Sequence, residues 1–524
     1  MKATPSRDLE YTKYFDPLTP KSSYRRSRHY YIIQNSLIIT HVLPTPPHSS
    51  LFPWLLHLSF SSLSSCSSFL LPPPQPLHHQ TLIPTPLQDY PTLTPLLGQT
   101  LTHTTDSSSL HLPISHHDSF HFTSNLTSSS LLLLLLNRDS SRVSSLHSLL
   151  GLPRHSNRSF ISPIVSGLSY GSGEYFTRIG IGTLQTQSLF VLDTGSDVVW
   201  VQCAPCRHCY NQTGRIFNPR NSRSYRSVPC IAPLCHRLDL PGCDKRRQKC
   251  LYEVSYGDGS VTTGELSTET LTFSGGARIG RVVVGCGHDN EGLFVAAAGL
   301  VGLGRGPLSF PSQLARRYGR QFSYCLVDRT SSGAPPKPSS IVFGSGSVPT
   351  GIAFTPMVRN PKLATFYYVQ LIGISIGGAP VSGFAQSDLR LNRQTGRGGV
   401  IVDSGTSVTR LARSVYVAVR DAFRAGTAGL KRTAGGFSLF DTCYDLSAHS
   451  EVKVPTLAMH FAGGAVVALP PENYLIPVDT TGTFCFAFAG TDSGVSIIGN
   501  IQQQGFRVVF DADRERIGFV PRGC

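Results

Sequence analysis

The chain carries one short motif twice, and this repeat restricts the folds that the sequence can adopt. Residues 190–196 read FVLDTGS and residues 400–406 read VIVDSGT, so each copy has three apolar residues, an aspartate, a hydroxyl residue, a glycine and a second hydroxyl residue. About a hundred residues after each copy comes a second apolar element that ends in glycine, GLVG at 299–302 and SIIG at 496–499. One β-rich unit written twice indicates two related lobes.

A third Asp-Ser-Gly, at residues 492–494, shows how weak the three letters are alone. It follows an Ala-Gly-Thr sequence, with no apolar strand leading into it, and Asp, Ser and Gly all favour turns. We interpret this copy as a surface turn. The same interpretation is open in principle for Asp193 and Asp403, but the apolar run, the hydroxyl residue and the paired second element favour a functional role for them.

From residue 162 onward the sequence has the rhythm of an all-β protein. Short runs rich in Val, Ile, Phe, Tyr and Thr are separated by glycines about every 8–12 residues. Helical patterns are limited to short segments such as 311–318 and 413–425. The net charge of +15 comes from scattered Lys and Arg residues, which indicates a solvated surface, so we do not expect a nucleic-acid partner.

The first 160 residues are different, because they are rich in Ser, Leu, Pro, Thr and His and show no sustained helical or alternating period. The best apolar candidate for a targeting signal, residues 50–71, contains a proline and begins far from the usual position of a signal peptide. Residues 131–150 predict an amphipathic helix at the end of a pro-segment, with a leucine-rich linker as the alternative. No stretch of 18 or more apolar residues exists, so we expect no membrane-spanning helix.

These features divide the chain into four parts. Residues 1–90 are expected to be a low-complexity extension with a targeting region, and residues 91–160 a pro-segment. An N-terminal lobe over 161–345 and a C-terminal lobe over 346–524 follow. The N-terminal lobe contains a cysteine-rich insert at 203–250.

Twelve of the 13 cysteines lie between Cys203 and Cys524, and Cys66 stands alone. An even dozen fits disulfides formed in an oxidising compartment. The spacing of Cys203, Cys206 and Cys209 around His208 also resembles a zinc site, but the insert is a Pro/Ser/Arg-rich loop with few apolar residues, which favours disulfides. Three glycosylation sequons begin at Asn125, Asn157 and Asn211 and are compatible with a secretory route.

The paired aspartates point to a specific chemistry. An aspartate at the end of a buried strand costs free energy unless it is hydrogen-bonded or paired. Two such carboxylates brought together share one proton, so one activates a water as general base while its protonated partner polarises a carbonyl. The glycine amides and the hydroxyls of Ser196 and Thr406 are expected to hold the carboxylates coplanar. This chemistry needs no covalent intermediate, no metal and no cofactor.

Over residues 162–524 the chain resembles the pepsin-like (family A1) aspartic endopeptidases, and most closely the plant nepenthesin-like branch, which includes the aspartic protease in guard cell type. The resemblance rests on VLDTGSDVVWVQC, YGDGS, AAGLVGLGRGPLSFPSQL, VIVDSGTSVTRL and SIIGNIQQQGFRVVFD together. It implies a bilobal pepsin-like fold with the active-site cleft between two β-rich lobes. It also implies an aspartic-type endopeptidase that hydrolyses proteins or peptides at acid pH, in all expectation as a monomer.

The resemblance assigns roles to particular residues. Asp193 and Asp403 are implied to be catalytic, and Tyr256 to be the tyrosine of a flap that closes over substrate, with Trp200 supporting it. The remaining motif residues, expected to support the dyad or to form the flap, are Thr194, Gly195, Ser196, Ser404, Gly405, Thr406, Gly257 and Asp258. From the sequence alone, Tyr256 is also compatible with an ordinary cross-strand tyrosine beside a Gly-Asp-Gly turn.

The family pattern further implies a set of disulfides, since connectivity does not follow from the sequence itself. The implied pairs are Cys203–Cys206, Cys209–Cys286, Cys230–Cys250, Cys235–Cys243, Cys325–Cys524 and Cys443–Cys485.

Members of this family are usually made as zymogens. Our hypothesis is that a basic residue of the pro-segment, Arg138, Arg142 or Arg158, pairs with the dyad near neutral pH and is released on acidification. We expect secretion to the apoplast or delivery to the vacuole, with the chloroplast as the alternative. Two other functions stay open: a catalytically silent binding or inhibitor protein on the same fold, and a chloroplast protease that also binds DNA.

Overall fold

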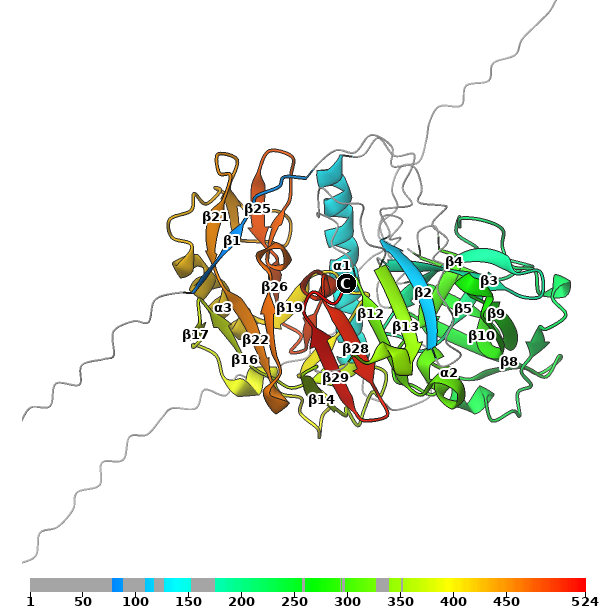
Figure 1. Cartoon of the computed structure of the whole chain (residues 1–524). Coiled ribbons are helices and arrows are strands. Elements are labelled where there is room, and N and C mark those ends of the chain that lie inside the picture. Colours follow the sequence, from blue (N-terminus) through cyan, green and yellow to red (C-terminus); the bar gives the residue numbers. More distant parts are fainter. Residues whose placement is uncertain are drawn as a thin grey trace, which may run out of the picture. The chain divides into compact units, whose positions relative to one another are not determined.

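The computed structural model describes residues 78–87, 109–116, 127–151, 175–256, 260–292, 294, 297–326, 339–349 and 352–524. All of these belong to one compact unit, residues 73–524 (Figure 1). Strands dominate, and the expected helices are present as α2 (Phe310–Tyr318) and α3 (Arg413–Gly426). The expectation of an all-β, two-lobed protein is confirmed.

The N-terminal lobe is built mainly from long antiparallel strands. β9 and β10 form its largest ladder, and β3, β4, β5 and β8 extend the sheet around it. The strands of this lobe are β3 (Tyr175–Ile181), β4 (Thr186–Asp193), β5 (Trp200–Gln202), β6 (Arg226–Ser227), β7 (Gly242–Asp244), β8 (Lys249–Ser255), β9 (Val261–Thr272), β10 (Arg278–Glu291) and β11 (Gly299–Gly302).

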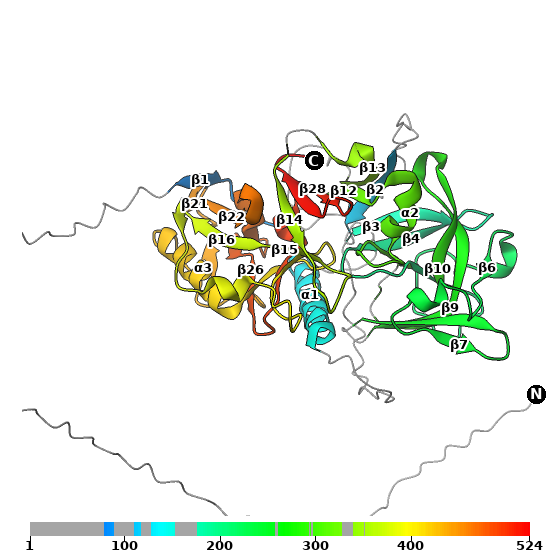
Figure 2. The same cartoon turned by 90° about the horizontal axis from the view of Figure 1, so that it is seen from below.

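The C-terminal lobe has shorter strands arranged in smaller sheets, and α3 packs against β19 and β26 (Figure 2). Its strands are β15 (Tyr367–Val369), β16 (Leu371–Ile376), β17 (Ala379–Pro380), β18 (Val400–Val402), β19 (Thr409–Ala412), β20 (Cys443–Asp445), β21 (Val452–Pro455), β22 (Leu457–Phe461), β23 (Val466–Leu469), β24 (Leu475–Pro477), β25 (Thr483–Phe486), β26 (Phe488–Thr491) and β27 (Ser496–Ile498).

A sheet with the strand order β2–β13–β12–β28–β29–β14 draws on both halves of the chain. β12 (Gln321–Cys325) and β13 (Ser339–Gly344) come from the first half, whereas β14 (Phe354–Val358), β28 (Arg507–Asp511) and β29 (Arg516–Val520) come from the second. The short helix α4 (Asn500–Gln503) leads into β28. Phe322 of β12 and Phe510 of β28 lie opposite each other in this sheet, and their rings are buried and stacked with centroids 4.7 Å apart.

The duplication seen in the sequence is a duplication of structure. In the first half β4 runs parallel to β11, and β5 pairs antiparallel with β11. In the second half β18 runs parallel to β27, and β19 pairs antiparallel with β27. The two Asp-Thr/Ser-Gly motifs thus leave equivalent strands, because β4 ends at Asp193 and β18 ends one residue before Asp403.

Three segments of the first 160 residues, where the sequence shows no sustained strand period, contribute elements to the fold. β1 (His79–Leu82) pairs with β21, β2 (Ser109–His116) pairs with β13 and β3, and α1 (Ser128–Gly151) forms the predicted helix. β1 and β2 are stabilised by the strands with which they pair, because such short strands bury little surface alone. β2 does alternate, with Leu110, Leu112 and Ile114 buried, but its Ser, His and Pro residues hid the pattern.

The apolar residues of α1 are buried against the C-terminal lobe. Leu132, Leu135 and Leu136 join a cluster that includes Val408 and Phe440. About two turns further on, α1 packs into a second cluster, which comprises Val143, Leu146, Phe366, Tyr368, Ile401, Val495 and Ile497. The helix therefore packs on the C-terminal lobe rather than acting as a linker. No helix in the described residues combines the length and the apolar character needed to cross a membrane.

Four of the six implied disulfide pairings are wrong. The structure joins Cys203–Cys286, Cys206–Cys209, Cys230–Cys243 and Cys235–Cys250 in place of Cys203–Cys206, Cys209–Cys286, Cys230–Cys250 and Cys235–Cys243. The expected pairs Cys325–Cys524 and Cys443–Cys485 are present.

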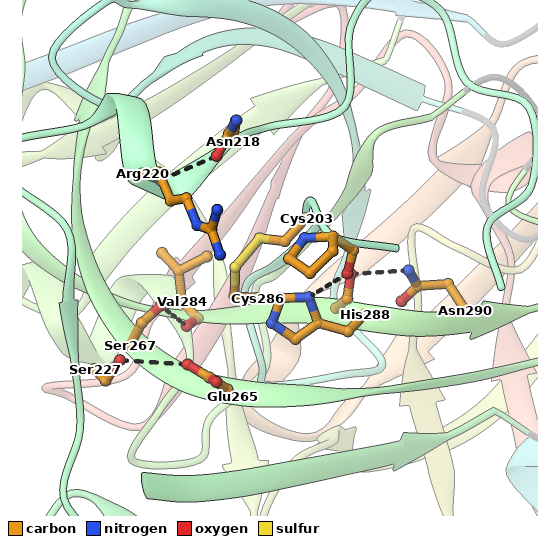
Figure 3. The surroundings of a disulfide bond; sticks show 12 residues. Cys203, Asn218, Arg220, Ser227, Glu265, Ser267, Val284, Cys286, His288 and Asn290 are labelled. Carbon is orange, nitrogen blue, oxygen red and sulfur yellow. Dashed lines mark hydrogen bonds between the residues drawn. A yellow bond between two sulfur atoms is a disulfide. The ribbon is translucent and has the colours of Figure 1, made fainter. Parts of the chain in front are cut away.

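Strand pairing explains why Cys203 bonds to Cys286 and not to Cys206. β5 runs beside β10 with Val201 opposite Cys286, which brings the next cysteine of the chain, Cys203, to a Cα–Cα distance of 5.3 Å from Cys286 (Figure 3). Cys206 and Cys209, three residues apart, then form a disulfide with each other. In the insert, Cys243 and Cys250 face each other across the β7–β8 hairpin, and their partners in the preceding loop are exchanged relative to the expectation: Cys230 bonds to Cys243 and Cys235 bonds to Cys250.

Candidate active site

The two motif aspartates lie together at the ends of their strands, and both are 1% exposed. Their hydrogen bonds are nearly symmetric. Asp193 accepts from the Ser196 hydroxyl at 2.6 Å and the Gly195 amide at 2.9 Å. Asp403 accepts from the Thr406 hydroxyl at 2.6 Å and the Gly405 amide at 3.3 Å. The second hydroxyl of each motif therefore fixes the plane of its own carboxylate.

The first hydroxyl residue of each motif reaches into the other motif. The Ser404 amide donates to Thr194 Oγ1 at 2.9 Å, and the Thr194 amide donates to Ser404 Oγ at 3.3 Å. Thr194 Oγ1 also donates to Asp403 Oδ1 at 3.1 Å. These exchanged hydrogen bonds tie the two strands together directly beneath the carboxylates.

A cation from α1 occupies the space between the carboxylates. Arg142 Nη2 donates to Asp193 Oδ1 and lies 2.9 Å from Asp403 Oδ2, while its Nε lies 3.0 Å from the same Asp403 oxygen. Burial alone lowers the pKa of Arg142, but the charges of Asp193 and Asp403 outweigh it and raise the pKa above its ordinary value. A side chain at Gly405 would collide with this guanidinium, so the glycine is needed for the close approach.

Of the three arginines that the sequence suggested for this role, Arg142 is the one that contacts the dyad. Arg138 is buried elsewhere on the same helix, and Arg158 lies outside the described residues. In the sequence, the signal for an arginine that pairs with the dyad was the short group of charged residues within the Leu/Ser-rich segment of α1.

The expected flap residue is close to its expected partner. Trp200 Nε1 donates to the hydroxyl of Tyr256 at 2.8 Å, and both rings pack edge-on against Phe294. Tyr256 follows β8, and its amide donates to the Ser260 carbonyl at 2.7 Å, which closes the turn toward β9. Gly257 and Asp258 lie outside the described residues, as do Asn125 and Asn157. Asn211 is exposed.

Sequence reasoning missed two acidic residues of this site. Asp139 of α1 accepts from the amides of Ser407 and Val408 and pairs with Arg410. Asp197, four residues after Asp193, accepts from the Gly306 amide and the Thr365 hydroxyl, each at 2.8 Å. Burial raises the pKa of Asp197 to about 6. Neither residue belongs to the Asp-Thr/Ser-Gly pattern, so their positions gave no signal.

The described residues offer few places for a cation or a small ligand away from the dyad. Cys203, Cys206 and Cys209 are all in disulfides and cannot act as zinc thiolates. One potential ligand atom from each of exposed His208, half-buried Asp289 and exposed Glu291 lies within 4.8 Å of the other two. A cavity of about 900 Å³ is lined by Arg305, Arg320, Arg359, Arg393 and Glu515, among others, and by none of the dyad residues.

Comparisons with known proteins agree with this geometry. Family models described as "Xylanase inhibitor N-terminal" and "Xylanase inhibitor C-terminal" match residues 175–345 and 366–521. Aspartyl protease family protein 2 of Arabidopsis thaliana is 58% identical over 80% of this chain and 86% of its own. Protein ASPARTIC PROTEASE IN GUARD CELL 2 of the same plant is 45% identical (81% and 90%), and aspartic proteinase nepenthesin-1 of Nepenthes gracilis is 39% identical (76% and 87%).

Among solved structures, the protein called edgp is similar with a TM-score of 0.55 and 22% identity, covering 66% of this chain and 91% of its own. Basic 7S globulin from soybean is similar with a TM-score of 0.51 and 22% identity, covering 66% and 92%. At this level of identity the likeness concerns the fold.

Proposed function

The chain belongs to the pepsin-like aspartic proteases, in their plant nepenthesin-like branch, and from this premise we propose how it works. It is an endopeptidase in which a water activated between Asp193 and Asp403 attacks the peptide bond, with an acid pH optimum. It is made as a zymogen that Arg142 keeps inactive near neutral pH. The observation that carries the proposal is that one guanidinium nitrogen, Arg142 Nη2, lies within hydrogen-bonding reach of both carboxylates.

The chemistry follows from removing that guanidinium. Without a cation between them, two adjacent carboxylates cannot both remain ionised, so they share one proton. The ionised member takes a proton from a water molecule, the water oxygen bonds to the carbonyl carbon, and the protonated member donates to the carbonyl oxygen. The resulting tetrahedral intermediate breaks at the C–N bond as the aspartic acid that took the water proton donates it to the nitrogen. The other aspartate takes back the proton from the former carbonyl oxygen, so the amine and the carboxylic acid leave and the shared proton is restored. The hydroxyls of Ser196 and Thr406 hold each carboxylate in plane throughout.

Acid favours this state in two ways. Acid supplies the shared proton that catalysis requires. The same proton weakens the ion pairs that hold Arg142, because it cancels one of the two negative charges facing the guanidinium. We therefore propose that release of α1 and assembly of the competent dyad occur over the same pH range.

The flap and the disulfides support the rest of the proposal. The Trp200–Tyr256 hydrogen bond holds the tyrosine at the base of a hairpin whose closure would exclude water from a bound peptide. Six disulfides are typical of a protein that matures in an oxidising compartment, so we propose passage through the secretory pathway.

The test is cleavage of an unfolded protein by the full chain between pH 2 and 7, with and without a pepstatin-type inhibitor. We expect acid-dependent, inhibitable activity that Asp193→Asn lowers at least a hundredfold. Arg142→Gln is the matched variant for the zymogen: it should gain activity at higher pH, because its neutral side chain no longer forms an ion pair with the dyad. More than a tenth of the wild-type activity in Asp193→Asn would overturn the mechanism, and an unchanged pH profile in Arg142→Gln would overturn the role of Arg142.

A further inference from the structure

α1 places an acidic side chain on the C-terminal lobe as well as a basic one in the dyad. Asp139 precedes Arg142 by three residues and lies on the same side of the helix, with a side chain that is fully buried. Its Oδ1 accepts from the amides of Ser407 and Val408, the latter at 3.1 Å. Its Oδ2 accepts from Arg410 Nη2 at 2.6 Å. Two amides and one guanidinium thus surround a single carboxylate.

The three donors belong to the lobe and are held without help from α1. Ser407 and Val408 directly follow the second motif, and the Ser407 carbonyl accepts from the Ile501 amide at 3.0 Å. The Thr409 amide and hydroxyl donate to Gln502 Oε1. Arg410 itself sits in β19, paired with β26 on one side and β27 on the other. The site therefore keeps its shape when the helix leaves.

Among the residues that the structure describes, Asp139 is the one acidic group that forms an ion pair with Arg410. Arg410 is 5% exposed. Its Nε has no hydrogen-bond partner, and the other groups facing it from α1 are the Ser140 hydroxyl at 3.3 Å and the His147 ring. Since a partly buried cation is costly without a counter-charge, removal of α1 leaves a site that favours an anion.

We propose that this site, formed by Arg410 and the amides of Ser407 and Val408, is a subsite of the substrate cleft that binds an acidic side chain of the substrate. The proposal rests on the proposed function, because it requires that α1 be replaced by a substrate. Asp139 then occupies, in the zymogen, the place that an Asp or Glu of the substrate takes in the active enzyme.

The distance along the cleft limits where the acidic residue stands. Three residues of helix advance about 5 Å, and an extended peptide advances about 3.3 Å per residue. Allowing for the reach of the side chains, the acidic residue lies roughly two to four residues from the scissile bond. The geometry thus predicts a preference for acidic residues near, but not at, the bond that is cut.

The experiment uses the full chain after acid activation, assayed at pH 5, where most substrate carboxyl groups are ionised. Peptide pairs carry Glu or Gln at each position within four residues of the cleaved bond, and the readout is the ratio of kcat/KM for the two peptides. At one position we expect a ratio on the order of ten to a hundred, the range for a hydrogen bond to a charged group. Arg410→Gln should bring that ratio close to one, and Arg410→Glu should favour Lys at the same position.

Asp139→Asn is the matched control. It weakens the docking of α1 in the zymogen but should leave the ratio of the activated enzyme unchanged, because α1 no longer occupies the cleft. A synthetic peptide of residues 128–151 covers the case in which the Arg410 variants fail to fold. As an inhibitor of the activated wild type it should lose about tenfold in potency on Asp139→Asn.

The outcomes separate the two proposals. No cleavage of any peptide would overturn the proposed function. Cleavage with a Glu/Gln ratio near one at every position, or equal inhibition by the two 128–151 peptides, would overturn the acidic subsite and leave the protease intact. A ratio that survives Arg410→Gln would also overturn the subsite as described.

Discussion

The two lobes agree around the dyad and differ almost everywhere else. The N-terminal lobe contains the Cys203–Cys286, Cys206–Cys209, Cys230–Cys243 and Cys235–Cys250 disulfides, whereas the C-terminal lobe contains Cys443–Cys485. The C-terminal lobe instead receives β1 on β21 and the apolar stripe of α1. A duplicated unit has thus kept one shared centre while its halves acquired different means of stabilisation.

The asymmetry reaches the motifs themselves. The residue four positions after each aspartate is Asp197 in the first lobe and Ser407 in the second. Asp197 is a buried acid that belongs to the first lobe and accepts a hydrogen bond there from the Gly306 amide. At the equivalent position of the second lobe, the Ser407 amide donates to an acid of α1, Asp139. α1 therefore contacts the C-terminal lobe in particular, which is why the proposed subsite lies on that side.

The sharpest test of the shared centre is to compare Asp193→Asn with Asp403→Asn. In the proposed mechanism both aspartates take part in proton transfer, so each substitution should lower kcat by a factor of roughly 10²–10⁴. Single-turnover cleavage of one peptide by both activated variants measures the loss. A variant that keeps more than a tenth of the wild-type rate would show that the two halves are not chemically equivalent.

The exchanged hydrogen bonds allow a paired test of stability. Thr194→Val removes the acceptor of the Ser404 amide and the donor to Asp403, whereas Ser404→Ala removes the acceptor of the Thr194 amide. Each leaves a buried amide unsatisfied and should cost about 1–3 kcal/mol of unfolding free energy, with Thr194→Val the more costly. Urea unfolding of both variants checks the order, and equal losses would contradict the asymmetry.

Asp197 has no acidic counterpart in the second lobe, which makes its pH dependence specific to the first. Its pKa is about 6 in the folded protein and near 3.8 when unfolded, so the folded state binds more protons between these values. Its favourable contribution is complete below pH 3.8 and is lost as the pH rises through 6. Asp197→Asn should therefore raise the unfolding free energy at pH 7 by about 3 kcal/mol, seen as a higher thermal midpoint, and should change it little at pH 3.5.

The structure favours that substitution, because an amide at this position still accepts from the Gly306 amide and can donate to the Thr365 hydroxyl, which is free to turn. Thr365→Val provides the control for lost hydrogen bonding without a change in charge. If Asp197→Asn is less stable than wild type at pH 7, ionisation of this buried carboxyl is not destabilising.

The smallest expected effect concerns the docking of α1. His147 faces Arg410 and the Val495 carbonyl, and burial lowers its pKa to about 4 from 6.5. The released helix thus binds a proton more readily, so docking is strongest above pH 6.5 and weakens as the pH falls toward 4. His147→Gln removes this contribution of histidine protonation to the release of α1, so the release should move to a lower pH.

The pH at which trypsin cleaves after Arg138 or Arg142 reports that release. Ser144→Gln, at an exposed position on the same helix, is the control for the added amide. A release midpoint that stays the same in His147→Gln would show that the dyad and Arg142 alone set the pH.

The sequence was sufficient where a local pattern matched a local structure. The apolar run into Asp-Thr/Ser-Gly predicted the strands and the dyad, and the residues around 131–150 predicted α1. It was insufficient where partners come from far along the chain. The Cys203–Cys286 disulfide depends on β5 lying beside β10, and no spacing of cysteines in the sequence predicts that. The ion pair of Asp139 with Arg410 likewise depends on how α1 packs on the C-terminal lobe.

The Cys325–Cys524 disulfide has a consequence for a protein that digests proteins. It joins β12 to residue 524 across a sequence separation of 199, so the whole C-terminal lobe is a covalently closed ring. A single cut by a neighbouring copy in any loop of that ring opens it without releasing a fragment, and the hydrogen-bonded strands on both sides stay in place. Such an enzyme tolerates self-inflicted nicks, which appear on a gel only after reduction.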